Sequence, residues 1–170
     1  KRGRGAAGKA LVGIAVEVTK RDGHEIMGRL RLRHLEDASC DSLIPFIQDV
    51  IQQKSMVHTD DWSGYTILSG CGFSHMVVST SELKSAHLIA ALLKRWLLGT
   101  YQGAVRPSHL AYYLDEFTFR FNRRTSASRG KLFYRLVQQA MMIDPAPAYS
   151  LKGAPLPFLA GQDNSNLDPL

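Results

Sequence analysis

LVGIAVEVTKRDGHEIMGRLRLRHL, residues 11–35, holds the clearest structural signal in this chain. Residues 11–18 are apolar and rich in β-branched side chains, which predicts a buried strand. The Asp22-Gly23 dipeptide that follows is typical of tight hairpin turns. Residues 25–35 then alternate apolar and charged side chains, as a half-exposed strand does. The stretch therefore predicts an antiparallel hairpin.

Helical periodicity and two short strands follow the hairpin. Asp37 or Ser39 can cap a helix that runs to about Gln53, because the apolar residues there recur at helical spacing. The later elements are expected as strands over 55–59 and 75–79, a short helix over 62–68, and helices over 85–98, 108–123 and 128–143. Strands that alternate with helices predict an α/β fold, a sheet with helices on its faces. Ligands of such sheets bind at the carboxyl ends of strands, where Asp60 stands.

The composition fits one globular domain with an excess of positive charge. The chain has 170 residues, of which 45% are hydrophobic and 21% are charged, and its formal net charge is +6. The cations concentrate between residues 94 and 135, at Lys94, Arg95, Arg106, Arg120, Arg123, Arg124, Arg129, Lys131 and Arg135. Only Asp115 and Glu116 are acidic there. This excess predicts a surface that faces phosphate, and a merely solvated face is the alternative.

Several classes of protein and site are excluded. Cys40 and Cys71 stand far apart without a CxxC partner, so we expect two free thiols in a reducing cytoplasm rather than a zinc site or disulfides. No apolar run approaches the roughly 18 residues of a membrane span, and no signal peptide opens the chain. The sequence lacks P-loop, dinucleotide-binding and Gly-x-Ser-x-Gly motifs, which argues against kinases, dehydrogenases and hydrolases. We therefore expect a cytoplasmic protein with no membrane partner.

Three segments are expected along the chain. Residues 1–9 are rich in Gly, Lys and Arg and predict a flexible arm. Residues 10–150 contain the α/β domain, and residues 151–170 predict a flexible tail. Because the Lys1-Arg2-Gly3 start resembles the middle of a loop, we expect a fragment of a longer protein.

Three side chains are candidates for chemistry on a nucleic-acid backbone. Asp60 follows a buried strand, so its carboxylate can reach an open crevice and bind a hard cation. The alternative for Asp60 and Asp61 is a turn or helix cap before Trp62. His87 and Lys94 are seven residues apart on a predicted helix, so they lie on one face, about 10 Å apart along its axis. His87 can bind a metal or relay a proton and Lys94 can hold a phosphate, although a lone helical His is more often structural.

The helix expected over 108–123 carries an apolar stripe that is more typical of a core than of a base-stacking platform. The stripe consists of Leu110, Tyr113, Leu114, Phe117 and Phe121. Arg120, Arg123 and Arg124 point away from the stripe and can meet phosphate. Trp96, on the preceding helix, fits a core residue and an interface residue equally.

Three ordered motifs occur between residues 58 and 124. They are HTDDWSGY at 58–65, LKR and GTY within 93–101, and YLDEF and FNRR within 113–124. Together they resemble the catalytic domain of the ISXO-like DDE transposases of bacterial insertion sequences, over roughly residues 1–150. The resemblance implies an RNase H-like fold, a mixed sheet flanked by helices, whose acids bind two divalent ions. The family's first Asp lies on a strand that would come just before Lys1, so we expect this chain to lack that central strand.

The resemblance also implies roles for individual residues. Asp60 corresponds to the second catalytic acid and metal ligand, and Asp61 stands where the family usually has Gly. His87 corresponds to the third position, where the family commonly has Glu. Because imidazole suits Mg²⁺ poorly, Mn²⁺ is the better candidate of the two ions. Lys94 corresponds to the signature Lys that holds the DNA backbone, and Arg95, Arg120, Arg123 and Arg124 would follow that backbone.

These observations predict a DNA transposase catalytic domain. In the intact protein it would cleave and join strands at insertion-sequence ends, as a homodimer and with two metal ions. The fragment itself is expected to be inactive. Two alternatives from other classes are a non-catalytic nucleic-acid-binding remnant and an interaction domain that uses Trp96 and the Phe-rich helix.

Overall fold

The computed structural model describes residues 9–102 and 105–145. The chain divides into two compact units, residues 1–126 and residues 127–170. The expected arm, apart from Lys9, and the expected tail lie outside the described residues. All the strands and three of the four α-helices described belong to the first unit.

The predicted hairpin is confirmed. Strand β1 (Leu11–Arg21) pairs antiparallel with β2 (His24–Leu35). Asp22 and Gly23 form the turn with φ values of 53° and 78°, the left-handed pair that two-residue hairpin turns require. The register shifts between Val16 and Val18, and there the carboxylate of Glu17 accepts the backbone N–H of Arg29 at 3.0 Å. Glu17 thus supplies the acceptor that the interrupted ladder lacks.

A second, parallel pair of strands follows. Strand β3 (Met56–Thr59) pairs with β4 (Ser74–Val77), close to the expected positions. The α/β class is confirmed, but the described residues form two separate two-stranded sheets rather than one continuous mixed sheet. Between β3 and β4, the expected short helix is replaced by two 3₁₀ turns, Ser63–Tyr65 and Leu68–Cys71.

The helices lie close to their predicted positions. They are α1 (Cys40–Val50), α2 (Lys84–Tyr101), α3 (Leu110–Asn122) and, in the second unit, α4 (Arg129–Met141). Ser39 caps α1 by accepting the backbone N–H of Ser42. Hydrogen bonds from Ser39 and Ser42 hold the pKa of Asp37 below its ordinary value, so both predicted capping residues act at this helix start.

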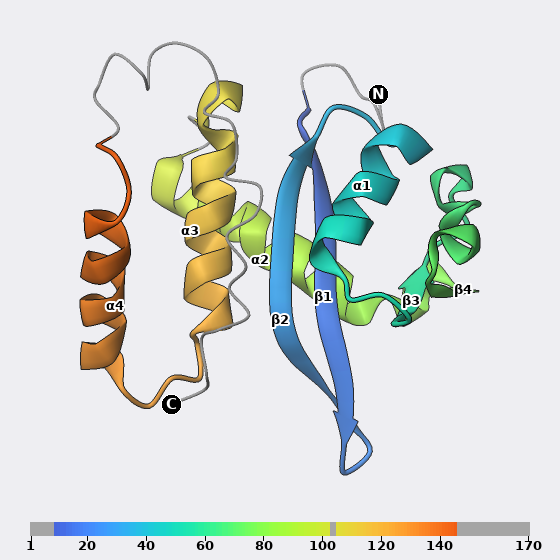
Figure 1. The fold of residues 1–170 in the computed structure, drawn as a ribbon, viewed down its shortest axis with the longest axis horizontal. Helices are drawn as coiled ribbons and strands as arrows, with labels where there is room; N and C mark the ends of the chain where they lie inside the picture. Colours follow the sequence, from blue (N-terminus) through green and yellow to red (C-terminus); the bar gives the residue numbers. More distant parts are fainter. Residues whose placement is uncertain (1–8, 103–104, 146–170) are drawn as a thin grey trace. The chain divides into compact units, whose positions relative to one another are not determined.

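Helices cover both faces of the hairpin in the first unit (Figure 1). On one face, α1 packs Leu43 and Phe46 into a core with Leu35 of β2 and Val57 of β3. On the other face, α2 and α3 pack Leu93, Leu110 and Leu114 against Val12 and Leu32. Successive strand side chains point to opposite faces, which explains how one apolar hairpin supports two cores.

The outer edge of β2 is covered by a side chain from α3. The backbone N–H of Leu30 donates to Oδ1 of Asn122 at 2.7 Å, and Nδ2 of Asn122 donates to the Leu30 carbonyl at 3.0 Å. This amide replaces a neighbouring strand at one residue of β2. It also ties the end of α3 to the hairpin.

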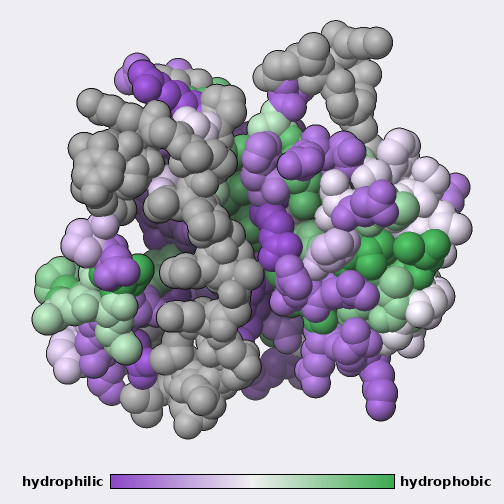
Figure 2. Space-filling view, turned by 45° about the horizontal axis from the view of Figure 1, so that its top comes forward, coloured by the Kyte–Doolittle hydropathy of each residue, from purple (hydrophilic) through white to green (hydrophobic). Residues whose placement is uncertain are grey.

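Helix α4 presents an apolar stripe to its surroundings. Phe133, Leu136, Val137 and Met141 recur at helical spacing and are 71%, 49%, 38% and 83% exposed. Figure 2 shows hydrophobic side chains on the surface of this helix. None of the helices among the described residues is both long and apolar enough to cross a membrane.

Candidate functional site

A hydrogen-bonded relay fixes the backbone at the carboxyl end of β3. The Thr59 hydroxyl donates to the Asp60 carbonyl at 2.9 Å and lies 2.7 Å from Nε2 of His75. Because the Thr59 hydroxyl donates its proton to the Asp60 carbonyl, its oxygen accepts from His75, and His75 donates its Nε2–H. Thr59 is only 6% exposed, so this relay holds the peptide of Asp60 from inside the molecule. Asp60 itself is half-buried.

A hollow of about 410 Å³ opens beside this strand end. It is lined by Asp61, Trp62, Ser63, Tyr65, Thr66, His75 and Val77. The indole N–H of Trp62 donates to the Ala38 carbonyl at 2.6 Å and fixes one wall. The carboxylate on the hollow is therefore that of Asp61, the neighbour of the predicted Asp60.

His87 lies in the first turns of α2, as predicted, and its ring is exposed. Its Nε2 is 3.0 Å from the carbonyl oxygen of Thr80. Since a carbonyl only accepts, Nε2 carries the proton, and only Nδ1 keeps a lone pair for a metal or a proton.

A short chain of contacts joins the end of β3 to the start of α2. The backbone N–H of Val78 donates to the Thr59 carbonyl at 2.9 Å, which brings the residue after β4 alongside Asp60. Hydrogen bonds from Ser79 lower the pKa of Glu82, and the nearby His58 of β3 adds a smaller effect in the same direction. The segment that leads to His87 thus runs beside the carboxyl end of β3.

The described residues do not assemble a metal centre. Among them, no group of three or more His, Cys, Asp or Glu side chains is arranged to hold an ion. Hard divalent cations take several oxygen ligands, so Asp60 and His87 do not fit a two-metal site by themselves.

The predicted phosphate-binding cations differ in their surroundings. Lys94 and Arg95 are consecutive exposed residues of α2. Arg120 is also exposed and pairs with Glu116 one helical turn away, at 3.3 Å. This surface ion pair is weak enough for a phosphate to replace Glu116.

Arg123 and Arg124 make intramolecular contacts at the end of α3. The Arg123 guanidinium lies 3.9 Å from the centre of the Phe119 ring, and that of Arg124 lies 4.0 Å from the centre of the Phe121 ring. Arg124 also donates to the backbone carbonyls of Phe121, Gly28 and Met27. Arg124 therefore helps Asn122 to fasten α3 to β2.

Comparison with known families identifies the chain's relatives. The family model of the ISXO2-like transposase domain matches residues 1–122. The chain belongs to the ISXO2-like transposase domain family. No curated protein and no solved structure matches it.

Membership in this transposase family confirms the resemblance seen in the motifs, although the match ends at residue 122 rather than near residue 150. Asp60, His87, Lys94 and Arg120 lie inside the matched segment, and α4 lies beyond it. Sequence reasoning assigned no role to His75 and included Asn122 only as part of the FNRR motif. Only the paired strands and the docked helix show what each contacts.

Proposed function

We propose that this transposase-family chain binds DNA through α2 and α3 as part of an RNase H-like catalytic domain. The observation that most supports this proposal is a set of exposed cations, Lys94, Arg95 and Arg120, on two adjacent helices inside the matched segment. Cations of this kind bind phosphate without regard to sequence and release counterions, so affinity falls as salt rises.

The strand pattern supports the RNase H-like part of the proposal. An antiparallel hairpin and a parallel pair, flanked by helices, remain when a mixed sheet lacks its central strand. In the intact transposase, DNA cleavage and strand transfer at insertion-sequence ends, with homodimerisation, would be the activity of the complete domain. Asp60 would contribute one carboxylate to an Mg²⁺ or Mn²⁺ site, together with His87 through Nδ1.

Nothing among the described residues supports a DNA-cleavage step in this chain. Without a three-ligand cluster among them, a divalent ion has no built site. We therefore propose that the 170-residue chain binds DNA without cutting it. The second candidate function is a non-catalytic nucleic-acid-binding remnant, in which the intact protein would not cleave DNA either.

Fluorescence anisotropy with a labelled duplex tests the binding proposal. The double variant Lys94→Gln/Arg95→Gln should lower affinity for all sequences and reduce the slope of log affinity against log salt by about 2. The matched control is Lys20→Gln/Arg21→Gln, which removes an exposed Lys-Arg pair at the hairpin tip. Equal losses in both variants would show that only net charge matters and would reject the assigned surface.

Supercoiled plasmid tests the inactivity proposal. With Mg²⁺ or Mn²⁺, the chain should leave the plasmid supercoiled on a gel, and the Asp60→Ala variant should behave identically. Metal-dependent nicking that disappears in Asp60→Ala would contradict this proposal while leaving the binding proposal intact.

A further inference from the structure

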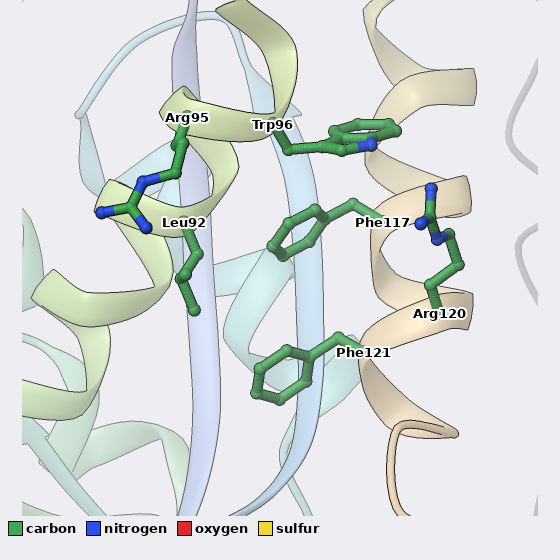
Figure 3. Close-up of a pocket in the computed structure, with 6 residues that line it drawn as sticks. All are labelled: Leu92, Arg95, Trp96, Phe117, Arg120 and Phe121. Carbon is green, nitrogen blue, oxygen red and sulfur yellow. The ribbon is translucent and has the colours of Figure 1, made fainter. Parts of the chain in front are cut away.

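A second hollow lies between α2 and α3, away from the end of β3. Its volume is about 490 Å³. It is lined by Leu92, Arg95 and Trp96 of α2 and by Phe117, Arg120 and Phe121 of α3. Figure 3 shows the Phe117 ring between those of Trp96 and Phe121, with the two arginines at opposite sides of this aromatic row.

The three rings form a row that is only half-buried. The ring centres of Trp96 and Phe117 are 5.5 Å apart, and those of Phe117 and Phe121 are 6.3 Å apart with planes inclined by 16°. An aromatic core usually excludes solvent on all sides, whereas this row borders an open hollow. Within the predicted apolar stripe of α3, Leu110 and Leu114 are buried in the core, whereas Phe117 packs against that core and also lines the hollow with Phe121.

The charge around the hollow selects the class of ligand. Arg95 and Arg120 are both exposed, and none of the six lining residues is acidic. Glu116 pairs with Arg120, but 46% of the Glu116 side chain is exposed, so water screens this contact. An apolar floor between two cations suits a planar aromatic group that carries a negative charge.

We infer that this hollow binds an unpaired nucleotide of DNA, with the base against the aromatic row and the adjacent phosphates on Arg95 and Arg120. The inference rests on the proposed DNA-binding function and deepens it. Paired bases are stacked inside a duplex, so the hollow acts only where a strand is frayed, displaced or single. Stacking on aromatic side chains accepts every base, which predicts binding without sequence preference.

The contribution of the bases can be tested on the unmodified protein by comparing a DNA strand that has bases with one that lacks them. The probes are a thymine single strand of about ten nucleotides and the same backbone with abasic sites. The chain should bind the thymine strand about tenfold more tightly than the abasic strand at equal salt. A 2-aminopurine in the strand should lose fluorescence on binding, because stacking quenches it.

Removal of one aromatic ring tests whether the hollow causes the difference in affinity between the thymine and abasic strands. Phe121→Leu keeps an apolar side chain and should weaken binding of the thymine strand about tenfold, while it leaves binding of the abasic strand unchanged. The matched control is Phe119→Leu, since Phe119 is on the same helix but does not line the hollow. Thermal unfolding of both variants verifies that they fold.

Each failure has a distinct meaning. Equal affinity of the unmodified chain for the thymine and abasic strands would overturn the inference even if Phe121→Leu fails to fold. Salt-dependent duplex binding alongside that result would leave the proposed function standing. If neither duplex nor single strand binds, both proposals fail. A change in oligomeric mass in Phe121→Leu without a change in DNA affinity would make the hollow a protein contact and reject the inference.

Discussion

Gly64 occupies a position that leaves no space for a side chain. A Cβ there would lie 2.6 Å from the Ala38 carbonyl oxygen, 2.7 Å from Cδ1 of Leu43 and 2.9 Å from Nε1 of Trp62. The Trp62 indole is itself anchored to Ala38, so the neighbours cannot move away easily. The Trp-Ser-Gly part of the motif that follows Asp60 therefore has a packing role, in addition to any role at the hollow beside it.

Gly64→Ala should lower the free energy of unfolding by about 1–3 kcal/mol, because overpacking forces the backbone of Ala38 and the Trp62 ring apart. Gly70→Ala is the matched control. No atom lies within 4 Å of a Cβ at Gly70 and its φ is not positive, so the change should be neutral or stabilising. Urea denaturation followed by circular dichroism measures both. Equal stability of the two variants would show that the packing at Gly64 is relaxed in solution.

At the scale of the element, one amide side chain satisfies the backbone of β2 where α3 docks on it. Asn122 satisfies both the N–H and the carbonyl of Leu30, whose side chain is 0% exposed. Asn122→Ala should lower the free energy of unfolding by about 1–3 kcal/mol, because it leaves two backbone groups without partners. Denaturant titration provides the measurement.

The Asn122→Asp variant tests the two hydrogen bonds to Leu30 separately. A carboxylate still accepts the Leu30 N–H but repels its carbonyl oxygen, so this variant should also be less stable than the parent chain. Full stability of both variants would mean that water replaces the amide at this edge. In that case, Arg124 and the apolar contacts of α3 would hold the helix in place.

At the scale of the whole molecule, local patterns and long-range contacts were predictable to different degrees. The hairpin, its turn and the approximate bounds of the four described α-helices follow from periodicity and turn chemistry within short windows of sequence. The bond between Asn122 and Leu30 joins residues 92 apart, and no local pattern encodes it. The same holds for the contact of Arg124 with the backbone of β2, while the phosphate-binding role of Arg124 stays a prediction. Asp60 was predicted from its place at the end of a strand, and the hollow beside that strand is lined by Asp61; no local pattern shows which of two consecutive carboxylates faces it.

The two units should differ in local stability. Helix α1 buries Leu43, Ile44, Phe46 and Ile47, whereas none of the described side chains of α4 is buried. Amide hydrogens are protected by the free energy needed to open the structure around them, and that energy is small for an element with few buried apolar contacts. Hydrogen exchange followed by mass spectrometry should therefore show peptides of α4 exchanging well before those of α1. Equal protection of the two helices, unchanged on dilution, would show that the chain itself covers the stripe of Phe133, Leu136, Val137 and Met141.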